Sequence, residues 1–167
     1  MNWYVLQTKA FHEKKLAERL KAKGIEHYLP IQTVRRKWSD RIKNVDKVVI
    51  PRVIFIHCEE NERVKVLQDP SALAYLMDRS TNKPAQVPQS QMNSFMMVMS
   101  QREIQVGFST QHLKPGMQVV IDDAIFDRVE AELVEIDGEK QVVVRILQLG
   151  CATLQVPLDS IRPKETP

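Results

Sequence analysis

The 167-residue chain has only two cysteines, Cys58 and Cys151, so a disulfide scaffold is excluded and a reducing cytoplasm is the expected compartment. No apolar run approaches the roughly 20 residues that a membrane-spanning helix needs, which argues against a transmembrane protein. Residues 1–7 lack the basic start and apolar stretch of a signal peptide. With 43% apolar residues, the chain is too hydrophobic for a disordered protein.

The sequence also lacks the patterns that accompany catalysis. It has five glycines, and no P-loop, GxGxxG or GxSxG motif occurs, so phosphate-cradling loops are not expected. The four histidines lie far apart, and the two cysteines form no CxxC pair, so metal-ligand spacing is missing. His57 and Cys58 are neighbours on a predicted strand, where their side chains point to opposite faces. We therefore expect no enzyme activity, no metal site and no cofactor.

The formal net charge of +3 hides an asymmetry along the chain. Residues 1–57 carry 13 Lys and Arg against 5 Asp and Glu, a balance of +8, whereas residues 58–167 carry 11 against 16, a balance of −5. A basic N-terminal region indicates a polyanion or an acidic protein surface as partner. Ordinary solvated surface charge is the alternative explanation.

Hydrophobic periodicity predicts an α+β domain over residues 1–100. Leu16, Ala17 and Leu20 recur at helical spacing, and Gly24 suits the residue after that helix, because glycine adopts positive φ without steric cost. The expected strands are 3–8, 27–34, 48–56 and 72–77, and the expected helices are 10–23, 60–68 and one from about residue 90, after a loop over 79–89. This order suits an antiparallel sheet with helices on one face.

Residues 101–112 are polar and are predicted to be a linker, after which the pattern is entirely of strands. The expected strands are 117–121, 130–136, 141–147 and 153–158. Asp137 and Gly138 form a strong tight-hairpin signal between two of them. These short strands predict a small β-barrel as a second domain, over residues 113–167.

Residues 35–47 are the most charged stretch of the chain, with too few apolar residues for a core strand. We predict a hairpin that projects into solvent, with its turn near Ser39 and Asp40. Basic groups neutralise phosphates, and an indole can stack on an unpaired base, so this hairpin is a candidate nucleic-acid interface. Its candidate residues are Arg35, Arg36, Lys37, Trp38, Arg41 and Lys43. The alternative is an exposed hairpin that is basic only for solubility.

A surplus of apolar residues surrounds the strand predicted at 48–56. Pro51 cannot donate to a ladder, so it marks an edge or a break between two strand pieces. Alternation places Val53 and Phe55 on one face and Ile54 and Ile56 on the other. With helices on only one side, the second face would expose an apolar patch, which usually marks a protein partner. The alternative is a strand that is buried on both sides.

Four segments, in chain order, resemble parts of the NusG-type transcription elongation factors. They are Trp3–Thr8 with the helix start Glu13–Ala17, then Tyr28–Pro30, Val49–Ile56, and Leu113–Val119 with Ala124–Phe126. Val49–Ile56 resembles the FPGYVFV-like signature of the family, and Leu113–Val119 resembles the start of its C-terminal KOW domain. Arg36–Lys43 and Val49–Val53 are similar to the specialised paralogues, namely RfaH and the UpxY-like antiterminators of capsular polysaccharide operons.

The resemblance implies an N-terminal NGN-like domain and a C-terminal SH3-like, KOW-like β-barrel. It also implies that the first domain docks on the clamp helices of RNA polymerase and suppresses pausing or termination. By position, the polymerase-binding residues would be Trp3, Tyr4, Ile50, Pro51 and Val53. The basic hairpin would approach upstream or non-template DNA, and the second domain would tether a ribosomal protein or Rho.

The sequence departs from the family pattern inside these motifs. Ile50, Arg52 and Val53 stand where the signature usually has Phe, Gly and Tyr. Ala124, Arg128 and Ala131 hold KOW positions that are usually glycine. Two other functions stay open: a stand-alone RNA- or ribosome-binding module, and a ligand-sensing domain, which would need a pocket with convergent polar groups.

Overall fold

The computed structural model describes residues 1–101, 105–110, 116–121, 129–146, 149–154, 156 and 160–164. The chain divides into two compact units, Met1–Gln89 and Ser90–Pro167. None of the helices in the described ranges combines the length and the apolar character that a bilayer crossing demands. Ala124–Phe126 and Arg128, which entered the comparison with KOW domains, lie outside the described residues.

The first unit is built on an antiparallel sheet. Its strands are β1 (Asn2–Thr8), β2 (Glu26–Tyr28), β5 (Val53–Cys58) and β6 (Ala72–Tyr75), in the order β2-β5-β1-β6, with the short β9 (Gln86–Val87) also pairing with β1. The expected strands at 3–8, 48–56 and 72–77 are confirmed in β1, β5 and β6. The strand expected at 27–34 is instead two strands, with a break after Tyr28.

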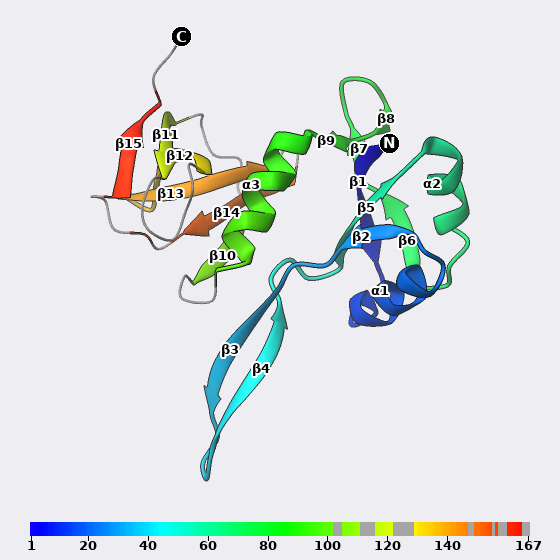
Figure 1. The fold of residues 1–167 in the computed structure, drawn as a ribbon, viewed down its shortest axis with the longest axis horizontal. Coiled ribbons are helices and arrows are strands. Elements are labelled where there is room, and N and C mark those ends of the chain that lie inside the picture. Colours follow the sequence, from blue (N-terminus) through cyan, green and yellow to red (C-terminus); the bar gives the residue numbers. More distant parts are fainter. Residues whose placement is uncertain are drawn as a thin grey trace. The chain divides into compact units, whose positions relative to one another are not determined.

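Two helices cover one face of this sheet, α1 (Glu13–Ala22) and α2 (Glu60–Val66) (Figure 1). Leu16 and Leu20 of α1 and Val66 of α2 are buried against Ile54 and Ile56 of β5. Both helices were expected from their periodicity and are confirmed. Gly24, with φ of +69°, follows the last turn of α1, and its N–H donates to the carbonyl of Lys21 (3.1 Å), as predicted for this glycine.

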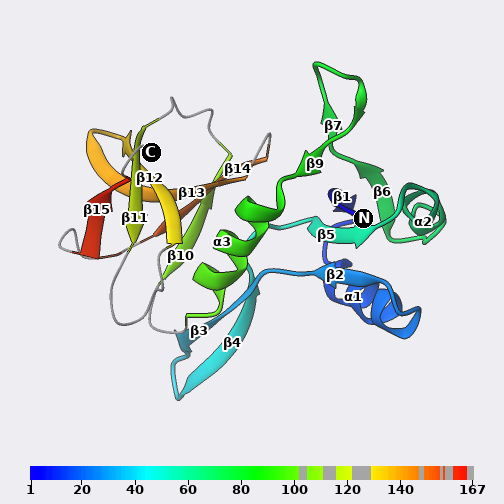
Figure 2. The ribbon, with the colours of Figure 1, turned by 45° about the horizontal axis from the view of Figure 1, so that its top comes forward.

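A separate two-stranded hairpin extends from the first unit, formed by β3 (Ile31–Lys37) and β4 (Ile42–Val48) (Figures 1 and 2). Its turn lies at Ser39 and Asp40, where the N–H of Trp38 donates to the carbonyl of Arg41 at 2.7 Å. The predicted hairpin and its turn are therefore confirmed. Pro51 lies between β4 and β5, as the predicted break requires.

The rest of the first unit connects β6 to its end. The short strands β7 (Met77–Asp78) and β8 (Lys83–Pro84) form a second two-stranded sheet, with a turn between them. Asn82 lies in this turn with a positive φ of 55°. The loop expected over 79–89 is therefore wrong in part, because β8 and β9 lie within it.

The second unit combines helix α3 (Gln89–Met99), from Ser90 onward, with a six-stranded antiparallel sheet. The strands are β10 (Val106–Ser109), β14 (Gly150–Leu154), β13 (Glu139–Ile146), β12 (Val129–Ile136), β11 (Met117–Ile121) and β15 (Ile161–Pro163), in this spatial order. In the described part of the chain the two end strands, β10 and β15, do not pair, so the closed barrel that was expected is not found.

Two details of this sheet bear on the predictions. Asp137 and Gly138 connect β12 to β13 with φ of +50° and +82°, which confirms the tight hairpin. β10 lies inside the segment predicted to be a linker, and it pairs with β14 from Val106 to Ser109. That segment is therefore partly a strand. The sequence did not show it, because a four-residue strand is too short for a periodic pattern and its partner β14 lies far along the chain.

Candidate functional site

The basic hairpin presents its cations to solvent. All six predicted nucleic-acid-binding residues are exposed, and the indole of Trp38 keeps 53% of its surface accessible at the tip. Those residues are Arg35, Arg36, Lys37, Trp38, Arg41 and Lys43. In the described ranges none of these cations takes part in an ion pair. The structure thus brings the predicted residues together on one protruding element.

The register of the hairpin places like charges opposite each other. Arg36 pairs directly with Lys43, and the neighbouring pair on the same face is Val34 with Val45. Arg35 and Lys37 fall on the other face. Like charges directly opposite one another destabilise a strand pair. Asp46 is the one acidic residue of the two strands, so the hairpin carries net positive charge on both of its faces.

The five predicted polymerase-binding residues have a different outcome. Trp3, Tyr4, Ile50 and Val53 are only 3–7% exposed, and Pro51 alone is exposed. The expected open apolar patch at these residues is wrong. Residues Val53–Ile56 of β5 are buried on both faces of the strand, which is the alternative that the sequence left open.

Trp3 and Tyr4 are adjacent on β1 and point to opposite sides of the sheet. The Trp3 ring stacks on His57 with centroids 4.6 Å apart, and its Nε1–H donates to Oε1 of Gln89 (3.0 Å). Tyr4 belongs to the core beneath α1 and α2, where the Arg63 guanidinium lies 5.5 Å from its ring centroid. The structure therefore does not bring these two aromatics into one surface.

The loop between β4 and β5 ends at Arg52, which has a left-handed φ of +64°. Its N–H donates to Oε1 of Glu13 (2.7 Å), and its carbonyl accepts from the N–H of Thr8 (2.9 Å). Glu13 is 6% exposed, so this carboxylate faces inward from the start of α1. A non-glycine residue in this conformation costs about 1–2 kcal/mol. The side chain of Arg52 is exposed.

The loop between β1 and α1 carries a second strained residue. Phe11 has φ of +63°, and its side chain is 91% exposed. Thr8 and Glu13, the two residues that flank this loop, are the same two that bond to the backbone of Arg52. Sequence reasoning missed Phe11, Arg52 and Glu13 as a group, because strain and an inward-facing carboxylate leave no mark in a hydrophobic pattern.

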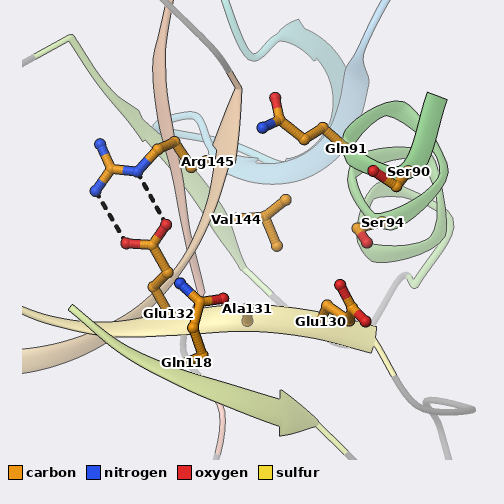
Figure 3. Close-up of a pocket in the computed structure, with 9 residues that line it drawn as sticks. All are labelled: Ser90, Gln91, Ser94, Gln118, Glu130, Ala131, Glu132, Val144 and Arg145. Carbon is orange, nitrogen blue, oxygen red and sulfur yellow. Dashed lines mark hydrogen bonds and ion pairs between the residues drawn. The ribbon is translucent and has the colours of Figure 1, made fainter. Parts of the chain in front are cut away.

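A pocket of about 170 Å³ lies in the second unit, between α3 and the sheet (Figure 3). Its main charged feature is the pair of Glu132 and Arg145, whose two hydrogen bonds measure 2.9 and 3.0 Å. The bonds from Arg145 hold the pKa of the Glu132 carboxyl below its ordinary value of 4.5, against the opposing effect of burial. The guanidinium is therefore already occupied by a carboxylate from the protein itself.

The comparisons with known proteins decide the family. Residues 1–96, more than half of the chain, match the model of a family described as transcription termination factor NusG. The chain belongs to the NusG family.

A structure of NusG from Thermotoga maritima matches with a TM-score of 0.53 at 17% identity, over 98% of this chain and 97% of that one. A chain of the MjSpt4:Spt5 complex covers 97% of both chains at 10% identity, with a TM-score of 0.33. None of the curated proteins compared with the chain matches it.

Membership of the NusG family makes this chain a transcription factor and confirms the family resemblance drawn from the sequence. At 17% identity, the likeness to the T. maritima protein shows a shared fold. The matched range holds the β3–β4 hairpin, the β4–β5 loop and the β1–α1 loop, so all three are features of this chain's NusG-like region.

Proposed function

We propose that the protein is a transcription elongation or antitermination factor that binds the clamp helices of RNA polymerase and suppresses pausing or termination. The observation that carries this proposal is the match of residues 1–96 to the NusG family. The second support is the loop at Val49–Arg52, which takes the place of the family signature and offers Pro51 to solvent.

Burial changes which residues can touch the polymerase directly. Pro51 is the contact residue of the predicted set, because it alone is exposed. Ile50 and Val53 flank it in the chain and are buried, so they anchor the loop from both sides. Trp3 and Tyr4 hold β1 in register with β5, and they support the docking loop from within.

The β3–β4 hairpin supplies the nucleic-acid contact in this proposal. Its cations are exposed and free of ion pairs in the described ranges, which is the state in which they can displace counterions from phosphates. Trp38 at the tip can stack on a base. We assign upstream or non-template DNA as the target, in line with the position of the hairpin in the family.

The second unit is assigned the role of the KOW-like domain. Its antiparallel strands and tight Asp137–Gly138 hairpin support this assignment. A ribosomal protein or Rho would be its partner, and polysaccharide biosynthesis operons would be the genes served, with cytoplasmic action. The domain bounds proposed for these roles are 1–100 and 113–167, joined through 101–112.

A pull-down of core RNA polymerase tests the proposal. Substituting Ile50 or Val53 by Asp would place a charge in the core and unfold the domain, so Pro51→Asp is the informative variant. We expect Pro51→Asp to abolish binding while its circular dichroism spectrum stays native. Val64→Asp is the matched control, because Val64 of α2 is 53% exposed and lies in the same unit. Equal retention of the polymerase by both variants would reject the docking loop.

A stand-alone RNA- or ribosome-binding module is the second candidate function. The observation in its favour is the net positive charge of the hairpin, which a polyanion other than the polymerase complex could also neutralise. A gel shift with RNA in the absence of polymerase separates the two. Tight RNA binding, together with no retention of polymerase, would favour the module.

A further inference from the structure

We propose that Arg52 is a specificity-determining residue of the docking loop, whose guanidinium binds a carboxylate on the polymerase surface opposite it. This inference rests on the proposed function, because it names the chemistry that the partner presents at the same loop. It begins from a conflict within the chain: a residue that favours negative φ occupies a turn with φ of +64°.

The backbone of Arg52 is fixed from two sides. The buried carboxylate of Glu13 accepts its N–H at 2.7 Å, and the N–H of Thr8 donates to its carbonyl at 2.9 Å. Both bonds involve only main-chain atoms of residue 52, so a glycine would make them equally well. Glycine would also adopt this φ without strain. The turn itself therefore gives no reason for an arginine here.

The side chain of Arg52 does little within the described residues. Its Nε–H reaches the carbonyl of Thr8 at 3.4 Å, a long hydrogen bond, and the guanidinium forms no ion pair there. The planar fork of donors is thus presented to solvent beside the exposed Pro51. Backbone strain that the surrounding contacts hold in place points to a functional position. Compared with glycine, the strained residue here adds only a guanidinium, whose donors suit a planar anion such as a carboxylate.

The surroundings of Arg52 favour a protein carboxylate over a phosphate. Thr8 and Glu13, which both bond to Arg52, flank the β1–α1 loop. Phe11 lies in this loop with φ of +63° and is 91% exposed. Pro51 adds a second exposed apolar group. Arginine and aromatic residues are enriched at the centres of protein interfaces. The densest group of exposed cations, which is what nucleic-acid contact requires, lies on the hairpin.

Three variants test the inference, each measured for its Tm and for its affinity for core RNA polymerase. Arg52→Gly relieves the strained φ, so its Tm should equal or exceed that of the wild type, while its Kd should rise about tenfold. Arg52→Lys keeps the charge but loses the fork, so it should lose most of the same affinity. Asn82→Gly is the matched control: it relieves a similar φ of 55° in the β7–β8 turn and should leave binding unchanged.

The outcomes separate this inference from the proposed function. If the wild type does not bind polymerase, the proposed function fails, and this inference fails with it. If the wild type binds and Arg52→Gly binds equally well, only the inference is overturned. A duplex and a single-stranded oligonucleotide complete the set. A loss of oligonucleotide affinity in Arg52→Gly, with polymerase affinity intact, would show that the fork holds a phosphate and would also overturn the inference.

Discussion

Arg36 lies directly opposite Lys43 across the β3–β4 hairpin. Cations in this position repel each other, and the hairpin is a two-stranded sheet of its own, without a third strand to stabilise it. Short, isolated hairpins are marginally stable in water. A polyanion that lies along this face would remove the repulsion, so the pair links the stability of the hairpin to the nucleic acid that we assign to it.

Reversing one charge of the pair should separate stability from binding. Arg36→Glu places a carboxylate opposite Lys43, which should stabilise the hairpin by about 0.2–1 kcal/mol because attraction replaces repulsion. The same change should weaken DNA binding and lower the slope of log K against log salt, by about 1 for each phosphate that is no longer neutralised. Titrating labelled DNA at several salt concentrations measures this slope.

Lys65→Ala, an exposed cation of α2, is the matched control and should leave the slope unchanged. The triple change of Arg35, Arg36 and Lys37 to alanine should flatten the slope further than the single variant. A slope that none of the hairpin variants alters would remove the hairpin from nucleic-acid binding.

Glu13 should position the docking loop without touching the polymerase. Its buried carboxylate accepts the N–H of Arg52, so Glu13→Ala leaves that donor without its partner and should cost about 1–2 kcal/mol of unfolding free energy. Polymerase affinity should fall as well, because the turn at Arg52 is released. Denaturant unfolding and the polymerase pull-down measure the two effects. A variant as stable as the wild type would contradict this role of the bond.

Local patterns predicted the β3–β4 hairpin, the β12–β13 hairpin and the helices of this fold. Turns and helix ends depend on a few neighbouring residues, through positive φ or turn-forming side chains. The examples are Asp137–Gly138, Gly24 and the charged turn at Ser39–Asp40. β10 shows the converse. Its pairing with β14 joins residues more than 40 positions apart, from Val106 with Leu154 to Ser109 with Cys151, so a polar composition concealed a strand.

The candidate site was predicted with the same unevenness. Exposure of the hairpin cations followed from their density along the chain. The burial of Ile50 and Val53 could not be predicted in this way. An apolar run has the same sequence pattern whether one face of the strand is covered or both are, and here these residues are buried. Arg52 was noted only as a departure from glycine. Its left-handed φ and the Glu13 carboxylate that holds it needed three-dimensional contacts to be seen.

The two tryptophans should differ in their accessibility to a quencher in solution. Trp3 is 4% exposed and stacked on His57, whereas Trp38 is 53% exposed. Acrylamide should therefore quench about half of the emission readily, and Trp38→Phe should leave only a protected, blue-shifted signal. Adding DNA should protect Trp38 from acrylamide and leave the emission of Trp3 unchanged. In Trp38→Phe, DNA should therefore have no effect on quenching. Uniform quenching of both indoles would contradict the burial of Trp3.

The Glu132–Arg145 pair should make the second unit sensitive to acid. The hydrogen bonds from Arg145 lower the pKa of the Glu132 carboxyl in the folded chain, so its stabilisation is complete above the unfolded pKa, near 4.5. It is lost as the pH falls through the folded pKa. Glu132→Gln should therefore cost about 1 kcal/mol at pH 7, since both partners are partly buried, and the difference from wild type should shrink below pH 4.5. Glu135→Gln, an exposed change on the same strand, should show no such pH-dependent difference. Thermal unfolding from pH 7 to pH 3 measures both variants, and a Glu132→Gln deficit that stays constant across this range would show that the ion pair does not stabilise the sheet.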